Sequence, residues 1–251
     1  MKLRADVFPP QQAGAIAGAT YLITVATAIF SEFFVRSTLI VSGDAARTAS
    51  NIVAHAQLFR FSIVCDLLGC AGVAILNLAL YELLAPVHRS LARLAAFWRM
   101  AEVSVGGAIT VSSLIALSLL TGADYLQAFQ PHQLQALARL FLGAQTSGYL
   151  IALLFFGLGS TTYMYLLVRS RYVPRALALL GVGGSGLVVL FVTARILFPA
   201  SVVAAIAAVR ALPAVALALV ALIVVPILAF EAILGFWLLV KGVRIPEEWE
   251  S

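Results

Sequence analysis

The sequence predicts an all-α, polytopic integral membrane protein, and three observations point to this fold class. Of the 251 residues, 63% are hydrophobic and only 11% are charged, and the mean hydropathy is +1.05. A soluble domain of this length has a far more polar composition. The apolar runs are also continuous and rich in Leu and Ala, whereas the strands of a membrane barrel alternate over about 10 residues.

Six segments are long enough to cross a membrane, because a transmembrane helix needs roughly 20 mainly apolar residues. The predicted spans are approximately residues 14–35, 61–84, 93–120, 140–168, 175–197 and 213–240. Too little chain remains outside these spans for a separate soluble domain. We therefore expect a single transmembrane domain, residues 1–251, built as a bundle of six helices.

The longer connections between spans have helical signals of their own. Asp44 is a good N-cap, and apolar residues recur at helical spacing over residues 45–59. Pro131 can begin a helix that leads into the fourth span, and the apolar segment 201–212 lies between two prolines. The helical pieces at residues 45–59, after Pro131 and at residues 201–212 are predicted to cap the outer face. By contrast, residues 85–88 are predicted to form a short connection that stops the second span.

The distribution of Lys and Arg predicts the orientation, because short cytoplasmic loops hold the excess of these residues. One side of the predicted topology holds Lys2, Arg4, Arg89, Arg93, Arg169, Arg171, Arg175, Lys241 and Arg244; the other holds Arg36, Arg47, Arg60, Arg139, Arg195 and Arg210. Both termini are therefore predicted to be cytoplasmic. The net charge of +5 then reflects topology and attraction to lipid headgroups. Scattered charges of this kind do not favour nucleic-acid binding.

A polar cluster is predicted in the inner half of the bundle. The stretch FWRMAEVSVGG places Arg99 and Glu102 inside the third span, on one helix face. Residues at a similar depth complete the candidate cluster: Asn77, Tyr81, Glu82, Arg99, Glu102, Thr162, Tyr163 and Glu231. An unpaired charge in hydrocarbon costs at least about 2.5 to 3.5 kcal/mol. Arg99 is therefore expected to pair with Glu231 or Glu82.

The charge balance of this cluster leaves two interpretations open. It holds one cation and three carboxyls, so at least one carboxyl is expected to stay protonated unless another cation enters. One interpretation is a site that binds an ion, a proton or a polar headgroup, which is the default hypothesis for ionisable residues inside a membrane. The other is a structural ion pair that fixes helix packing.

A second polar group is predicted near the outer helix ends. Its members are Glu32, Arg60, Asp66, Arg139, Gln145 and Arg195. Arginines at helix ends extend readily to the interface, so ordinary anchoring explains most of this group. Asp66 is the exception, because it lies about one to two turns inside the second span.

Other motifs do not indicate a catalytic residue, a cofactor or a metal. Residues 181–186, GVGGSG, match the dinucleotide-binding pattern, but that pattern needs a preceding strand; here small residues favour close helix packing, as do Gly14 and Gly18. Cys65 and Cys70 have neither a metal-binding spacing nor a secreted framework. The three histidines are all predicted in loops or caps, which argues against haem or zinc sites.

Several blocks of the sequence resemble a bacterial family of six-helix membrane proteins known only as domain of unknown function 4386. The blocks are GDAARTASNIVAHAQLFR, DLLG, ALYELLAPV, AAFWRMAEV, FFGLGSTTYMYLLVRSRYVPRALALLGV and ILGFWLLVKGV. Together they cover most of the chain. The resemblance implies a shared architecture and a place in the bacterial cytoplasmic membrane, but it brings no activity with it.

Three functions fit these observations. The first is a small carrier or membrane-embedded receptor, although no inverted repeat of the kind found in many transporters relates the two halves. The second is a structural or accessory subunit in which the charges stabilise assembly. The third is an enzyme that acts on lipids, for which no nucleophile or metal motif is present. Membrane lipids are the expected partners, together with a small ligand or ion; the sequence does not identify a protein partner.

The orientation can be tested by thiol labelling of intact cells, after Cys65 and Cys70 have been replaced by alanine. A cysteine at Arg171, in the predicted inner loop 169–175, should resist a membrane-impermeant thiol reagent. A cysteine at Gln127, in a predicted outer connection, should react with it. Labelling at Arg171 but not at Gln127 would reverse the predicted topology.

Overall fold

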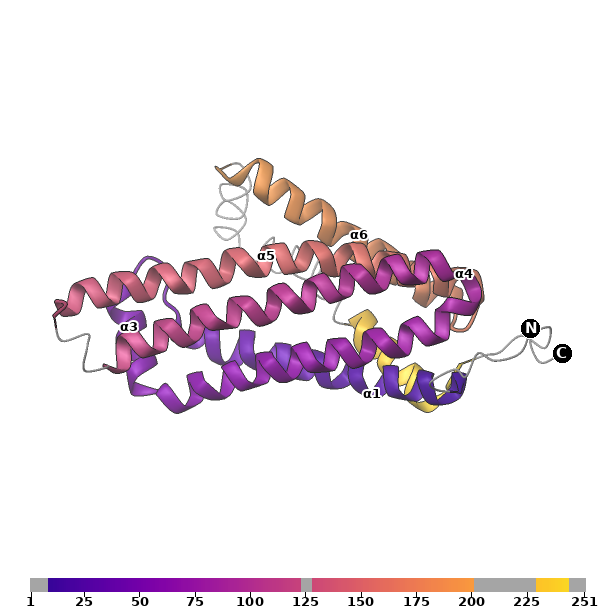
Figure 1. Ribbon diagram of the computed structural model, residues 1–251, viewed down its shortest axis with the longest axis horizontal. Helices are drawn as coiled ribbons and strands as arrows, with labels where there is room; N and C mark the ends of the chain where they lie inside the picture. Colours follow the sequence, from indigo (N-terminus) through magenta and orange to yellow (C-terminus); the bar gives the residue numbers. More distant parts are fainter. Residues whose placement is uncertain (1–8, 123–127, 201–228, 244–251) are drawn as a thin grey trace, which may run out of the picture. The chain divides into compact units, whose positions relative to one another are not determined.

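The structure, a computed structural model, describes residues 9–122, 128–200 and 229–243, and these residues form helices joined by short turns (Figure 1). The helices are α1 (Pro10–Ile29), the π-helix η1 (Phe30–Arg36), α2 (Ser37–Leu39), α3 (Ala45–Ala54), α4 (Ala56–Thr121), α5 (Pro131–Ser170), α6 (Arg175–Leu197) and a last helix, Ala229–Val240. No strand occurs within the described ranges. The all-α class is therefore confirmed.

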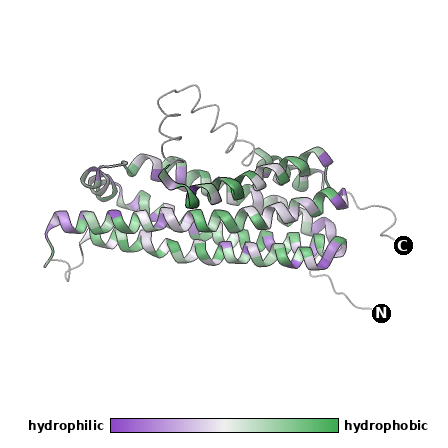
Figure 2. Cartoon of the chain, turned by 90° about the horizontal axis from the view of Figure 1, so that it is seen from above, coloured by the Kyte–Doolittle hydropathy of each residue, from purple (hydrophilic) through white to green (hydrophobic). Residues whose placement is uncertain are grey.

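Four of these helical stretches are long and apolar enough to cross a membrane: Pro10–Leu39, α4, α5 and α6. Figure 2 shows hydrophobic residues along most of each described helix, with many of the hydrophilic ones near the ends. The predicted segment 201–212 and the first part of the last predicted span, residues 213–228, lie outside the described residues. The count of six spans therefore stays a prediction.

The helix α4 consists of two helical arms that meet at His88 and run side by side (Figure 1). Helical geometry continues through Pro86, and the backbone leaves it at His88, where φ is −162° and ψ is 95°. The His88 Nδ1 atom accepts a hydrogen bond from the Leu91 amide at 3.2 Å. It thereby caps the first turn of the second arm, where amide groups lack helical partners.

The connection before α4 contains the short helix predicted from its capping residue. The Asp44 carboxylate accepts a hydrogen bond from the Arg47 amide at 2.8 Å, as an N-cap does. The helix ends at Ala54, and a turn at His55 separates it from α4. Helical structure also begins at Pro131, as predicted. The side of the membrane that these segments cover stays a prediction.

The chain divides into two compact units, each with its own buried core. The first unit comprises Met1–Leu22, Val73–Glu102 and Leu153–Ser251, and the second comprises Ile23–Gly72 and Val103–Ala152. Leu84, Leu167 and Leu234 are fully buried in the core of the first unit. In the second unit, Ile52 and Phe59 are fully buried and pack with Val35 and Leu142. Both cores therefore join helices that are distant in sequence.

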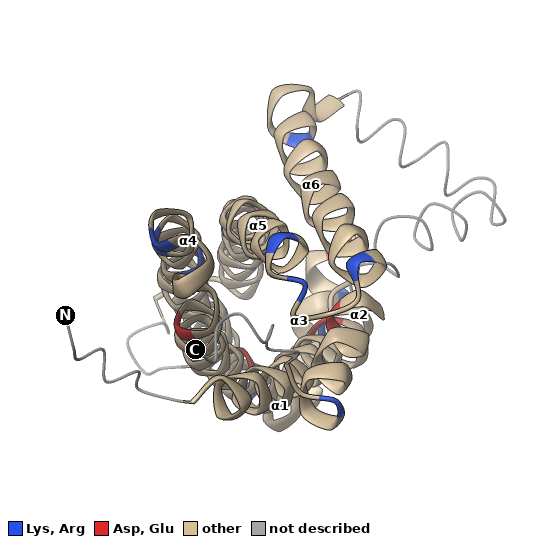
Figure 3. Cartoon of the chain, turned by 90° about the vertical axis from the view of Figure 1, so that its right-hand side faces the viewer, with Lys and Arg blue, Asp and Glu red and all other residues tan. Residues whose placement is uncertain are grey.

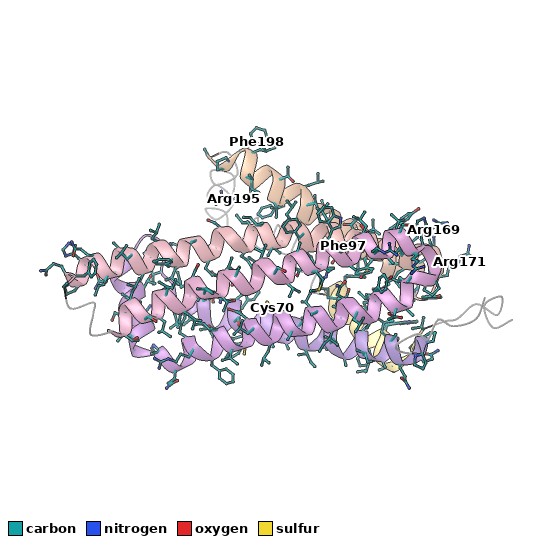
Figure 4. The ribbon with its side chains drawn as sticks, in the orientation of Figure 1. Cys70, Phe97, Arg169, Arg171, Arg195 and Phe198 are labelled. Atoms are coloured by element: carbon teal, nitrogen blue, oxygen red, sulfur yellow. The ribbon has the colours of Figure 1, made fainter. Side chains whose placement is uncertain are left out.

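The turn between α5 and α6 exposes its arginines and buries its centre. Arg169 and Arg171 are exposed at the end of α5 (Figure 4), whereas Tyr172 and Val173 belong to the core of the first unit. Burial raises the pKa of the Tyr172 phenol, because the charged form is poorly solvated there. This turn thus anchors two helices while it presents basic groups to solvent.

Backbone contact joins α1 to the last helix within the first unit. A Cβ atom added at Gly18 would lie 2.6 Å from the Gly235 carbonyl oxygen and 2.7 Å from the Leu239 nitrogen. The Gln11 side chain donates to the Val243 carbonyl at 2.8 Å and accepts from the Val243 amide at 3.2 Å. Small residues that permit such an approach are typical of membrane helix pairs.

The glycine-rich segment of α6 packs closely at Gly181, and Gly184 and Ser185 of the same segment are also buried. A Cβ atom added at Gly181 would lie 2.5 Å from the Phe230 ring. At Gly183 and Gly186 the added atom would meet nothing within 4 Å among the described residues. The packing interpretation of this motif is thus supported at Gly181.

The substitution Gly18→Ala should destabilise the protein, because the added methyl group meets backbone atoms that cannot move independently. Overpacking of this kind typically costs about 1 to 3 kcal/mol. Gly183→Ala is the matched control, and it should be neutral or stabilising by up to about 1 kcal/mol, since Ala favours helices over Gly. Thermal unfolding in detergent measures both. Equal effects at the two positions would contradict the close approach of α1 to the last helix.

Candidate functional site

Arg99 forms the centre of the inner polar cluster. It lies on the second arm of α4, with only 3% of its surface exposed. Its Nη1 atom lies 2.7 Å from the Oε2 atom of Glu102. The two residues are three positions apart, so both project from the same face of the helix. A buried ion pair is therefore built within a single helix.

Helix α5 also packs against Arg99. The Nη1 atom donates a long hydrogen bond of 3.5 Å to the Ser160 hydroxyl. The guanidinium carbon lies 5.0 Å from the centre of the Phe156 ring, a cation–π geometry. A Cβ atom added at Gly159 would lie 2.8 Å from Arg99 Cγ, so the aliphatic stem packs directly on α5. Three neighbouring positions of α5 thus accommodate one arginine.

The prediction that Arg99 pairs with Glu231 or Glu82 is wrong. Among the described residues, neither of these glutamates makes an ion pair. Glu102 is the partner because its place on the same helix face needs no approach between helices. Glu231, on the last helix, is partly buried and interacts electrostatically with Arg99 across the interior of the first unit.

Tyr21 of α1 also belongs to this centre. It is buried, and it interacts electrostatically with Glu231, Arg99 and Glu102. Tyr21 was not among the predicted members of the cluster, because a lone tyrosine in an apolar helix forms no recognisable pattern. Its depth in the first span was the one available signal.

A neutral hydrogen-bond network connects both arms of α4 with α5. The Tyr163 hydroxyl donates to the Asn77 side-chain oxygen at 2.7 Å. The Asn77 amide nitrogen donates to the Ala96 carbonyl at 3.2 Å. Both polar side chains are buried. Because their donors and acceptors are matched, this network stabilises the packing of three helical segments.

The remaining members predicted for the inner cluster do not join the ionic centre. The Thr162 hydroxyl donates to the Leu158 carbonyl of its own helix at 2.9 Å. Tyr81 and Glu82 are partly buried on the first arm of α4. The structure therefore brings together Arg99 and Glu102 directly, with Glu231 within electrostatic range.

In the second unit, Arg36 organises the outer polar group. Its guanidinium forms a bidentate ion pair with Asp66, in which Nη1 lies 3.3 Å from Oδ1 and Nη2 lies closer to Oδ2. Glu32 lies 3.7 Å from the same guanidinium. Arg36 was not among the predicted members of this group. It follows directly after the predicted span 14–35, and it is only 7% exposed.

The π-helix η1 explains the position of Arg36. A π-helical segment carries more residues per turn than an α-helix, so it changes which face later side chains occupy, and such segments are frequent at functional sites. The Ser31 hydroxyl donates to the Ser62 carbonyl at 3.1 Å, which holds η1 against α4. This contact, together with the Arg36–Asp66 pair, joins the two elements at successive turns.

The other predicted outer residues do not share this centre. Arg60 is exposed and Arg139 is partly buried, and neither takes part in an ion pair within the described ranges. Gln145 is buried in the second unit. Arg195 lies on α6 (Figure 4), which belongs to the first unit.

Metal-ligating residues do not gather in the described part of the chain. No group of three or more His, Cys, Asp or Glu side chains there could hold a metal ion. Both cysteines are free thiols, and an added Cβ atom at Gly106 would lie 3.1 Å from the sulfur of Cys70. The thiol therefore lies where the two arms of α4 pack closely.

Long apolar helices whose few charged side chains include buried, ion-paired arginines define the class of this chain as a helical, multi-pass membrane protein. The chain belongs to the family described as Domain of unknown function (DUF4386), whose sequence profile matches residues 16–242. That match includes Arg36, Asp66, Arg99, Glu102 and Glu231. No curated protein and no solved structure matches the chain.

The identity of the Arg99 partner can be tested with a double-mutant cycle. Arg99→Leu should lower stability by about 3 to 5 kcal/mol, because Glu102 is then left buried and unpaired. The double substitution with Glu102→Leu should restore much of that loss. Thermal unfolding in detergent measures each variant.

The corresponding cycle with Glu231→Leu serves as the control. Glu231 interacts with Arg99 at longer range, so its coupling to Arg99 should be the smaller of the two. A larger coupling for Glu231 than for Glu102 would contradict the observed ion pair.

Proposed function

We propose that the inner cluster is a membrane-embedded binding site for a proton or a small monovalent cation, located beside Glu231. The observation that supports this most directly is that, of the two carboxyls near Arg99, one forms an ion pair with it and the other does not. Glu102 holds the Arg99 guanidinium at 2.7 Å. Glu231 has no ion-pair partner among the described residues, although it lies within electrostatic range of that pair.

The charge balance favours a cationic ligand. One guanidinium and two carboxyls interact within the first unit, so ionisation of both acids would leave an excess negative charge in the membrane interior. Such a charge is costly unless it is neutralised. A bound proton, or a cation that accepts oxygen ligands, would neutralise it. A carboxylate is a suitable ligand for either.

The placement of the cluster supports a carrier or receptor role. Tyr21, Arg99, Ser160 and Glu231 come from α1, α4, α5 and the last helix, respectively. A site built from several helices changes its affinity when those helices move, and a ligand in turn favours the arrangement that binds it better. Membrane carriers commonly bind their substrates between helices near the middle of the bilayer.

A structural role for the Arg99–Glu102 pair is the second candidate function. The contacts of Arg99 with Phe156, Gly159 and Ser160 favour it, because they fix α4 against α5. Intramembrane polar contacts stabilise helix association. In this case the protein would be an accessory subunit, and occupation of the site beside Glu231 would not matter.

We also propose a six-span topology in the bacterial cytoplasmic membrane, with cytoplasmic termini and a helical cap on the outer face. Basic residues on α4, α5 and α6 at one end of the first unit support the orientation (Figure 3). Arg89, Arg93, Arg169, Arg171 and Arg175 are all exposed there. This excess is the feature that places short loops on the cytoplasmic side.

Cation binding can be tested through its effect on thermal unfolding in detergent. A ligand at 100 times its Kd stabilises a protein by about 2.7 kcal/mol. If the ligand is Na⁺ or K⁺, replacing choline with that cation at constant ionic strength should therefore raise the Tm of the wild type by several degrees. If the ligand is a proton, lowering the pH should have the same effect. Glu231→Gln should abolish this response, because the amide carries no charge to neutralise.

Glu82→Gln is the matched control. It removes a partly buried carboxyl from the same unit that also makes no ion pair in the described structure, and it should leave the response intact. An identical response in the wild type and Glu231→Gln would exclude the proposed site. A structural role for the cluster would then be favoured.

A further inference from the structure

A groove of about 310 Å³ lies between the two arms of α4 in the first unit. Its first wall includes Ala74, Leu78 and Tyr81, and its second wall includes Arg93, Phe97 and Met100. Each wall spans eight residues, at spacings that place its members along one helix face, over a length of about 10 Å. The groove is therefore elongated along the helix direction.

The two ends of the groove differ in chemistry. The arms run antiparallel from the turn at His88, so Tyr81 and Arg93 lie at the end nearest that turn. Ala74 and Met100 lie at the far end. One end therefore presents a guanidinium and a tyrosine, and the other presents only apolar groups.

The walls of the groove are exposed and almost wholly apolar. Phe97, which projects from α4 (Figure 4), is 67% exposed, and Leu78 and Met100 are 43% and 42% exposed. Asn77 also lines the groove, but its amide is already bonded to Tyr163 and Ala96. The interior of the groove thus suits a hydrocarbon chain and offers no site for a polar ligand.

We propose that this groove binds one anionic phospholipid, with an acyl chain between the arms of α4 and the phosphate at Arg93. Charge complementarity decides the occupant, because Arg93 is the charged residue in the lining. Basic pockets between membrane helices bind anionic headgroups. The exposed arginines Arg89, Arg169 and Arg171 at the same end of the unit strengthen the positive potential. This inference does not depend on the cation site beside Glu231.

Native mass spectrometry of the full-length protein in detergent can test the proposal by titration with phosphatidylglycerol or phosphatidylcholine. The wild type should retain one phosphatidylglycerol in preference to phosphatidylcholine. Arg93→Gln should reduce that preference about fivefold, the effect expected for one basic residue near a lipid surface. Arg89→Gln is the matched control, because it removes a neighbouring arginine that does not line the groove, and it should change the preference much less.

The acyl-chain part of the proposal has its own variants. Ala74→Phe fills the far end of the groove and should reduce retention of both lipids, whereas Ile75→Phe adds the same ring at an exposed position outside the lining and should not. Phe97→Ala removes part of a wall at an exposed position, so it should weaken lipid retention without loss of folding. Thermal unfolding confirms that each variant is folded.

Three results would overturn the proposal. Equal losses for Arg93→Gln and Arg89→Gln, without an effect of Ala74→Phe, would indicate surface charge alone. Competition by glycerol phosphate at concentrations similar to those of the lipid would indicate a site for a free phosphate. Dissociation of a lipid-free dimer by Ala74→Phe would indicate that a second copy of the chain fills the groove.

Discussion

A guanidinium inside hydrocarbon must be paired, and this constraint governs the centre of the first unit. Arg99 meets it with Glu102, one turn further along the same helix, at 2.7 Å. Because the pair is complete within α4, helix α5 needs only to cover it. The ring of Phe156 and the hydroxyl of Ser160 contact the guanidinium, and the absence of a side chain at Gly159 leaves room for the aliphatic stem of Arg99. The close packing of α4 on α5 follows from that arrangement.

In the second unit, the buried guanidinium is paired with a carboxylate on a different helical element. Arg36 reaches Asp66 on α4 from the π-helix η1, so the ion pair itself fixes the distance between them. An ion pair within one helix leaves the neighbouring helices free to move without breaking it, whereas a pair between helices resists such movement. The cation site that we propose lies beside the intrahelical pair, where motion of the last helix would not separate Arg99 from Glu102.

The second arm of α4 carries different side chains on its two sides. Arg99 faces α5 and the ionic centre, whereas Phe97 and Arg93 line an exposed groove. The buried Asn77 side chain lines the same groove, and its oxygen accepts a hydrogen bond from Tyr163 of α5. Membership of a family of unknown function assigns neither side a role. The function proposed here therefore rests on the charges and contacts of this chain alone.

The sequence by itself determined the helical membrane class, the Asp44 cap and the turn near His88, and it predicted a similar depth for Arg99, Glu102 and Glu231. These properties depend on composition, on local hydrogen bonds and on the rise of about 1.5 Å per helical residue. Only the tertiary structure decided which residues meet, since depth fixes a height along the helix axis and leaves rotation about that axis open. The i,i+3 spacing of Arg99 and Glu102 was readable from the sequence, but the rotation that left Glu82 and Glu231 without an ion pair to Arg99 and buried Tyr21 beside it was not. The π-helix likewise changed the direction in which Arg36 projects, because it has more residues per turn than an α-helix. The sequence did not predict this change, because a π-helix has no signature in hydropathy.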